Sequence, residues 1–168
     1  MQKAVAVVTS LGLGQAVFAI HHIGVKRKAF DLARDLVTYK GIINLGCGPR
    51  SIFTPLAREI AESPEVVVNV DIVPDTDLTN LTLLDIETDH LPWFDKTFDC
   101  AFMSHILEHL DDWEYALNEA IRVADHVVVV LPYPLSPAGL FHPDHKQHFT
   151  LGDMKNIEET YPSVTVFC

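Results

Sequence analysis

Apolar runs alternate with amphipathic stretches from residue 41 to the end of the chain. The runs typical of buried strands cover residues 41–45, 66–72, 81–86, 98–103 and 126–131, and a further run covers 164–168. Continuous rather than alternating apolar runs are typical of parallel strands that are covered on both faces. The pattern predicts an α/β fold, a doubly wound, Rossmann-like and mostly parallel sheet with helices on both faces.

The stretches between these runs carry helix signals. Residues 26–39 repeat apolar side chains at helical spacing, so we expect a helix that leads into the first strand. Thr54 and Pro55 read as an N-cap followed by proline at the first helical position. Asp111 can cap a third helix, with Glu114 at the capping-box position.

The first strand runs into a turn that contains Gly46 and Gly48. Glycine permits positive φ and a close approach of a ligand to the backbone, whose N–H groups attract polar or anionic atoms. A glycine pair alone is weak evidence, but the second strand ends in Asp71, at the interval where a nucleotide-binding βαβ unit presents an acid to ribose hydroxyls. The two signals together predict a nucleotide-like ligand.

Composition narrows the class of protein. The 168 residues, 48% of them hydrophobic, suit one globular domain with a sizeable core. Three scattered cysteines argue against a disulfide framework or a paired-cysteine metal site and favour a reducing, cytoplasmic location. A net charge of −11 makes nucleic acid a poor partner.

Residues 4–25 contain no formally charged side chain and lie between Lys3 and the cationic residues 26–28. This flanking is typical of a membrane segment, whereas the glycines and histidines within it weaken that interpretation. The alternative is a segment buried against the domain or a protein partner. We therefore divide the chain into an apolar N-terminal segment, 1–25, as a candidate for membrane or partner contact, and a ligand-binding domain, 26–168.

The region from Gly41 to about Leu131 resembles the class I S-adenosylmethionine-dependent methyltransferases of the UbiE-like or methyltransferase-11-like type. The resemblance is carried by the run LDIETDHLPWFDKTFDCAFMSHILEHL at residues 84–110 and by EAIRV at 119–123. It implies S-adenosylmethionine as cofactor and methyl transfer as activity.

The resemblance also implies roles for individual residues. Those expected to bind the methionine part of the cofactor are Asn44, Gly46, Cys47 and Gly48. Asp71, followed by Ile72, is expected to bind the ribose hydroxyls, and Asp85 and Ile86 are expected to frame the adenine. Met103 and Ser104 are expected to line the pocket after the fourth strand.

Two positions depart from the family pattern. Relatives usually carry an acid where Asn44 stands and often a glycine where Arg50 stands. Asn44 can form hydrogen bonds but supplies no charge for the methionine ammonium group. A catalytically weak or inactive cofactor-binding module of the same fold therefore stays open as an alternative.

The segment His105-Ile-Leu-Glu108-His109 also fits the H-x-x-E-H pattern of inverted zinc peptidases. That interpretation needs both histidines on one continuous helix, whereas a strand is predicted to end at about residue 103 and the next helix cap falls at residue 111. A zinc hydrolase is the remote alternative.

A histidine-rich loop at 142–148 follows the fifth strand, on the side of the sheet where substrates bind. Such a loop can supply a general base or bind a metal, and His105, Glu108 and His109 could face it. We name His105, Glu108, His109 and His145 as catalytic candidates and assign no metal ligand.

The chain has little material with which to enclose a substrate, so the acceptor pocket should be shallow. An exposed acceptor, such as a lipid head group, a sugar or a protein side chain, suits it better than a fully enclosed small molecule.

Relatives usually end with two further strands, of which this chain has room for one, 164–168, after a helix at 153–161. A helical crossover should place that strand beside the fifth, parallel to it, to give the order 3-2-1-4-5-6. The open edge that results should be covered by the N-terminal segment or by a second copy of the chain.

Overall fold

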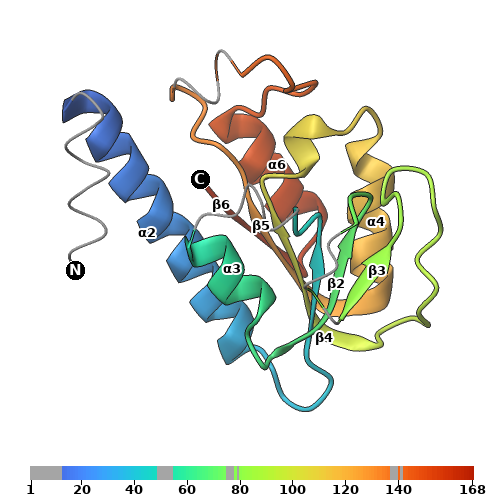
Figure 1. The fold of residues 1–168 in the computed structure, drawn as a ribbon. Coiled ribbons are helices and arrows are strands. Elements are labelled where there is room, and N and C mark those ends of the chain that lie inside the picture. Colours follow the sequence, from blue (N-terminus) through green and yellow to red (C-terminus); the bar gives the residue numbers. More distant parts are fainter. Residues whose placement is uncertain (1–12, 49–54, 75–77, 79, 137–139, 141) are drawn as a thin grey trace.

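The computed structural model describes residues 13–48, 55–74, 78, 80–136, 140 and 142–168. They form a six-stranded sheet in the order β3-β2-β1-β4-β5-β6, with every neighbouring pair parallel (Figure 1). The strands are β1 (Ile42–Leu45), β2 (Val66–Asp71), β3 (Leu81–Leu83), β4 (Phe98–Ser104), β5 (Ala124–Val130) and β6 (Val164–Phe167). The predicted fold class, strand order and direction are confirmed.

The central strands are buried on both faces, which explains why the sequence shows unbroken apolar runs there. All four residues of β1 are buried, and so are the first six of β4. Strand β3 ends at Leu83 rather than at residue 86 because the chain turns there: the Asp85 side chain accepts a hydrogen bond from the Glu87 N–H, 3.0 Å away.

Helices cover both faces of the sheet (Figure 1). On one face lie α2 (Leu13–Asp35) and α3 (Pro55–Ala61), where the ring of Phe30 packs edge-on against that of Phe102 with centroids 5.4 Å apart. The other face carries α4 (Trp113–Val123), α6 (Leu151–Thr160) and the short 3-10 helix η2 (Leu107–His109). Each face of the sheet therefore has its own apolar core.

Helix α2 begins well before the predicted Lys26 and ends at Asp35 rather than at Tyr39. It stops because the Asp99 carboxylate draws the next segment away from the helix: Oδ2 accepts hydrogen bonds from the backbone N–H groups of residues 38, 39, 40 and 41. The continuous helix also crosses the division drawn at residue 25 between the N-terminal segment and the domain.

The cap of α4 is Asp112, not the predicted Asp111. Its Oδ1 accepts from the backbone N–H of Tyr115, 3.1 Å away. Asp111 is engaged elsewhere, because its carboxylate pairs with Lys146. Helix α6 starts earlier than expected, at Leu151, since Thr150 and Asp153 form a reciprocal capping box.

None of the described helices is long and apolar enough to cross a membrane. The first part of the apolar segment, residues 4–12, lies outside the described residues, as do Arg50 and the predicted cap Thr54.

Candidate functional site

The loop after β1 has the backbone geometry that its glycines predict. Gly46 and Gly48 have φ angles of 69° and 76°, in the left-handed region where other residues are strained. The N–H of Gly46 donates to the Val70 carbonyl at 2.9 Å, and the N–H of Gly48 donates to Asp71 Oδ2 at 2.7 Å. The loop is thus fastened to the end of β2.

Gly46 also leaves no room for a side chain. A Cβ at this position would lie 2.5 Å from Cγ1 of Ile106, which reaches over the loop from the segment after β4. The two loops that follow the adjacent strands β1 and β4 therefore pack directly on each other.

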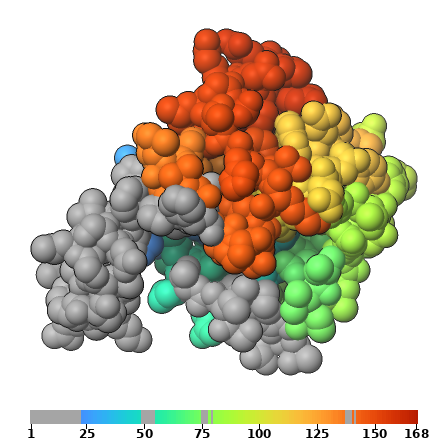
Figure 2. Space-filling model, turned by 90° about the horizontal axis from the view of Figure 1, so that it is seen from above, coloured from blue at the N-terminus to red at the C-terminus, as the bar shows by residue number. Residues whose placement is uncertain are grey.

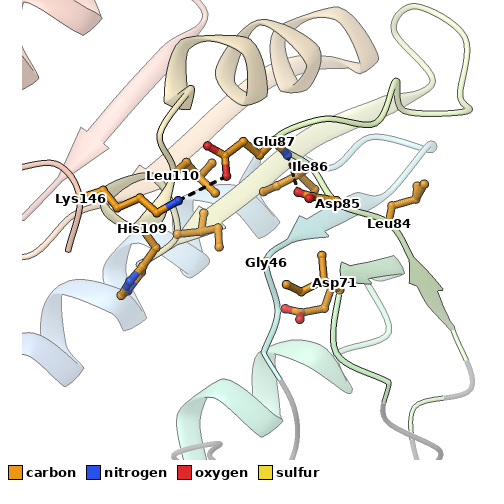
Figure 3. A pocket seen from close by; sticks show the side chains of 11 residues that line it. Gly46, Asp71, Leu84, Asp85, Ile86, Glu87, His109, Leu110 and Lys146 are labelled. Carbon is orange, nitrogen blue, oxygen red and sulfur yellow. Dashed lines mark hydrogen bonds and ion pairs between the residues drawn. The ribbon is translucent and has the colours of Figure 1, made fainter. Parts of the chain in front are cut away.

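A pocket of about 240 Å³ opens beside this contact, at the carboxyl ends of the strands (Figure 3). Its described lining consists of Gly46, Asp71, Ile72, Leu84, Asp85, Ile86, Glu87, Ile106, His109, Leu110 and Lys146. The crevice at this edge is where open α/β sheets bind their ligands. Figure 3 shows Asp71 and Asp85 on one side of it and His109 and Lys146 on the other.

Five of the predicted cofactor residues meet in this pocket: Gly46, Asp71, Ile72, Asp85 and Ile86. Asp71 is held by hydrogen bonds from two backbone N–H groups, those of Gly48 and Val73, and each carboxylate oxygen keeps a second lone pair. A pair of carboxylates among apolar side chains fits a nucleoside, whose hydroxyls need acceptors and whose base needs apolar walls.

The remaining predicted cofactor residues lie close by but are not part of the described lining. Cys47 and Gly48 belong to the loop, and Ser104 ends β4. Met103 is fully buried in the core beneath. Their roles toward the cofactor stay predictions.

Asn44 lies within the sheet rather than at its edge. Its side chain is buried and donates from Nδ2 to Oδ1 of Asn69, the residue opposite on β2, at 2.8 Å. Asn69 in turn donates to the Ala61 carbonyl and to Asn80. The amide at position 44 thus joins a polar network between β1, β2 and α3.

The segment after β4 starts with His105, which has a φ of 56°. This turn directs its imidazole toward Glu108, so that Nδ1 lies 3.0 Å from Oε1. Burial, with a smaller contribution from the positive charges of Lys26 and His109, lowers the pKa of His105 to about 3. His105 is therefore neutral at physiological pH and donates from Nδ1 to the carboxylate.

Glu108 is a carboxylate with none of its surface exposed. An ionised carboxylate is costly to bury unless cations or donors compensate it. Lys26 of α2 faces it: burial lowers the pKa of that amine to about 8, while the charge of Glu108 acts in the opposite direction. Residues of α2 thus contribute to the electrostatics of this site.

The histidine-rich loop closes on the same segment. Both Lys146 and Gln147 donate backbone hydrogen bonds to the Glu108 carbonyl, at 2.8 and 3.0 Å. The His109 ring lies with its centroid 4.8 Å from that of His145. In Figure 2 the loop after β5, in orange, lies against the yellow segment after β4. All four catalytic candidates are therefore brought together.

The zinc-peptidase arrangement does not form. The helix that follows β4 contains only Leu107–His109, and His105 precedes it with a left-handed backbone. The two histidines are therefore not one turn apart on a continuous helix, which that mechanism requires.

Several residues of the site were missed from the sequence: Lys26, Glu87, Ile106 and Lys146. The Nζ of Lys146 pairs with the carboxylate of Asp111 and lies 3.8 Å from Oε2 of Glu87. Both Lys146 and Glu87 line the pocket (Figure 3). Contacts between residues so far apart in the sequence leave no local sequence pattern from which they can be predicted. The histidine-rich stretch around Lys146 was the signal that could have directed attention to this residue.

Comparison with known proteins agrees with this geometry. The methyltransferase-11 family model, described as a methyltransferase domain, matches residues 43–127, half of the chain. The chain belongs to this family of S-adenosylmethionine-dependent methyltransferases, and S-adenosylmethionine is the cofactor that the assignment implies. A search of curated proteins gives no match.

Solved structures show the same fold at low identity. A SAM-dependent methyltransferase from Thermotoga maritima superposes with a TM-score of 0.55 at 16% identity, over 96% of this chain and 80% of the other. One from Archaeoglobus fulgidus gives 0.58 at 24%, over 82% and 66%. A chain of the complex between the Haloferax volcanii Trm112 methyltransferase activator and its methyltransferase gives 0.60 at 14%, over 84% and 67%.

Proposed function

We propose that this chain catalyses methyl transfer from S-adenosylmethionine to an exposed acceptor. The main observation behind the proposal is that one pocket contains residues from both expected binding sides. His109, on the expected acceptor side, lines the same cavity as Asp71 and Asp85, on the expected cofactor side. The family match supports the reaction class, and the pocket supplies the place where both reactants can meet.

The bound cofactor supplies a methyl group on a positively charged sulfur; transfer forms a bond from that carbon to the acceptor, breaks the carbon–sulfur bond and leaves neutral S-adenosylhomocysteine. In this scheme Asp71 and Asp85 hold the nucleoside, and Ile72 and Ile86 enclose it. The chain's main task is to align the reactants and exclude water.

His109 and His145 are the proposed acceptor-side groups. His109 lines the pocket, and its Nδ1 donates to the Asp144 carbonyl at 3.0 Å, so that in the neutral form of the ring Nε2 carries the lone pair. The hydrogen-bonded pair of His105 and Glu108 would position the segment that carries His109 and the loop that carries His145. A lipid head group, a sugar, a small molecule or a protein side chain could each approach from this side.

The test combines binding with turnover. Calorimetry should show binding of S-adenosylmethionine or S-adenosylhomocysteine, and incubation with acceptor panels of lipids, sugars and proteins should release S-adenosylhomocysteine. Failure to bind either compound at millimolar concentration would rule out the proposal.

The second candidate is a module that binds the cofactor without turnover. Asn44 favours it, because its amide is occupied by Asn69 and brings no charge to the methionine end. Cofactor binding without release of S-adenosylhomocysteine in any of the acceptor panels would support this candidate instead.

For the cell, we propose a reducing, cytoplasmic location, in keeping with three cysteines that are widely scattered along the sequence. A protein partner or a second copy of the chain is also proposed, since the Haloferax volcanii complex shows a chain of this fold bound to an activator. The N-terminal segment is the proposed contact with a partner or a membrane surface.

A further inference from the structure

Three side chains from two loops converge beside the cofactor pocket: Glu108 and His109 after β4, and His145 after β5. Each offers an atom of a kind that binds metals, and these atoms lie within 4.8 Å of one another. We propose that they form a site for a divalent cation of the zinc class, at the acceptor side of the pocket.

The chemistry of the three groups suits such an ion. Two imidazoles and one carboxylate form a mixed nitrogen and oxygen set that favours zinc and its neighbours over magnesium or calcium. Three protein ligands leave the fourth tetrahedral position open, as in zinc sites that act on a substrate. The set differs from the H-x-x-E-H arrangement, because His105 is not a member and His145 comes from another loop.

The orientation of His109 is the second observation. Its Nδ1 donates to the backbone carbonyl of Asp144, so the lone pair of Nε2 is available to bind a metal. Metal-bound histidines commonly have their other nitrogen fixed in this way. The neighbouring residue in the chain, His145, is the second proposed ligand, so one short segment both orients one ligand and supplies another.

His145 gives a third observation. Within the described part of the chain its Nδ1 is buried and has no hydrogen-bond partner. A buried polar atom of this kind calls for an explanation, and a bound ion provides one. The ring is also close to its proposed co-ligand, with centroids 4.8 Å apart from His109.

Binding requires a modest contraction. Ligand atoms on a tetrahedral zinc lie about 3.3 Å apart for bond lengths near 2.0–2.1 Å. The present spread of up to 4.8 Å therefore has to close by small shifts of the two loops and of the His145 ring. A divalent ion would also add to the compensation that Lys26 now gives the buried Glu108 carboxylate.

A role in methyl transfer rests on the proposed function. An acceptor hydroxyl or thiol bound at the open position would lose its proton to water more readily, because the ion stabilises the anion. That oxygen or sulfur then attacks the methyl carbon as the carbon–sulfur bond of the cofactor breaks. The expected acceptor is accordingly an alcohol, phenol or thiol.

The test uses the full chain, stripped of metal with a chelator and then titrated with Zn²⁺ or Co²⁺. We expect one equivalent to bind, with the visible absorption of tetrahedral cobalt. His145→Gln and Glu108→Gln should each weaken binding by about 10-fold or more. The matched controls are His126→Gln and His90→Gln, at exposed histidines on other elements, which should leave the affinity unchanged.

Folding and cofactor binding are measured separately on each variant, by thermal unfolding and by calorimetry with S-adenosylhomocysteine. A folded His145→Gln protein that keeps cofactor affinity but loses the metal supports the site, whatever the outcome of turnover assays. Absence of cobalt or zinc binding at micromolar concentrations, or equal losses in the ligand and control variants, would overturn it.

Discussion

The backbone N–H of Gly48 donates a hydrogen bond to Oδ2 of Asp71 at 2.7 Å, and so ties the loop after β1 to the end of β2. The same carboxylate lines the pocket, where we propose that it binds ribose hydroxyls. Asp71 thus has a structural role and a proposed binding role in one side chain.

Replacing Asp71 with alanine should weaken S-adenosylhomocysteine binding by about 10-fold or more, as expected for losing a hydrogen bond to a charged acceptor. Calorimetry measures the change, and Asp31→Ala, at an exposed position of α2, is the control. Asp71→Asn keeps one acceptor oxygen, enough for only one of the two backbone N–H groups of Gly48 and Val73, so we expect it to lose part of both roles. Unchanged affinity in Asp71→Ala would exclude it as a ligand.

Asp99 should make the protein sensitive to acid. Burial opposes ionisation, but hydrogen bonds from the Thr38 hydroxyl and from four backbone N–H groups outweigh it and lower the pKa of this carboxyl below its usual value. A lowered folded-state pKa contributes stability that is complete above the unfolded-state pKa, about 4, and is lost as the pH falls below it.

We therefore expect Asp99→Asn to reduce the free energy of unfolding by about 2–3 kcal/mol at pH 7 and to flatten its decline between about pH 5 and 2. Urea unfolding at several pH values measures both effects. If the unfolding free energy of the variant falls as steeply with decreasing pH as that of the unaltered protein, other carboxylates cause the acid sensitivity.

Gly46 and Gly24 should respond in opposite directions to alanine. At Gly46 the methyl group would meet Ile106 and the φ of 69° would be strained, so we expect a loss of about 1–3 kcal/mol and weaker cofactor binding. Gly24 lies inside α2, and among the described residues outside its own helix backbone no atom lies within 4 Å of an added Cβ, so alanine should stabilise by about 0.5–1 kcal/mol. Thermal and urea unfolding compare the two variants.

Arg122 should tolerate lysine poorly. Its guanidinium donates to Glu119 through Nε and Nη2 and also reaches the carbonyls of Leu91 and Trp93, which only a planar fork can combine. We expect Arg122→Lys to cost about 1–2 kcal/mol of unfolding free energy. Arg34→Lys, in the exposed pair with Glu65, is the control and should change stability by less than about 0.5 kcal/mol. Equal effects would refute this distinction.

The sheet could be predicted from the sequence because its central strands are buried on both faces and their apolar runs have no competing interpretation. Strand β2 was placed to within a residue, and its terminal Asp71 was identified from spacing to the glycine loop. The handedness of crossovers then left one position for β6.

Element ends and the acceptor side could not be predicted in the same way. The end of α2 depends on Asp99, some sixty residues further along the chain. The cap of α4 is Asp112 rather than the predicted Asp111, because the Asp111 carboxylate binds Lys146. The grouping of Glu108, His109 and His145 likewise depends on how two loops meet. Only their residue types were visible in the sequence.

Strand β6 ends the sheet, and one of its backbone groups is already occupied. The N–H of Val166 donates to Oε1 of Glu158, a side chain of α6, at 2.9 Å. A strand that paired with Val166 at this edge would have to displace that carboxylate, so we expect Glu158 to disfavour unspecific edge pairing. A binding partner at this edge has to form interactions strong enough to replace the hydrogen bond between Val166 and Glu158, and this requirement favours specific contacts over unspecific ones.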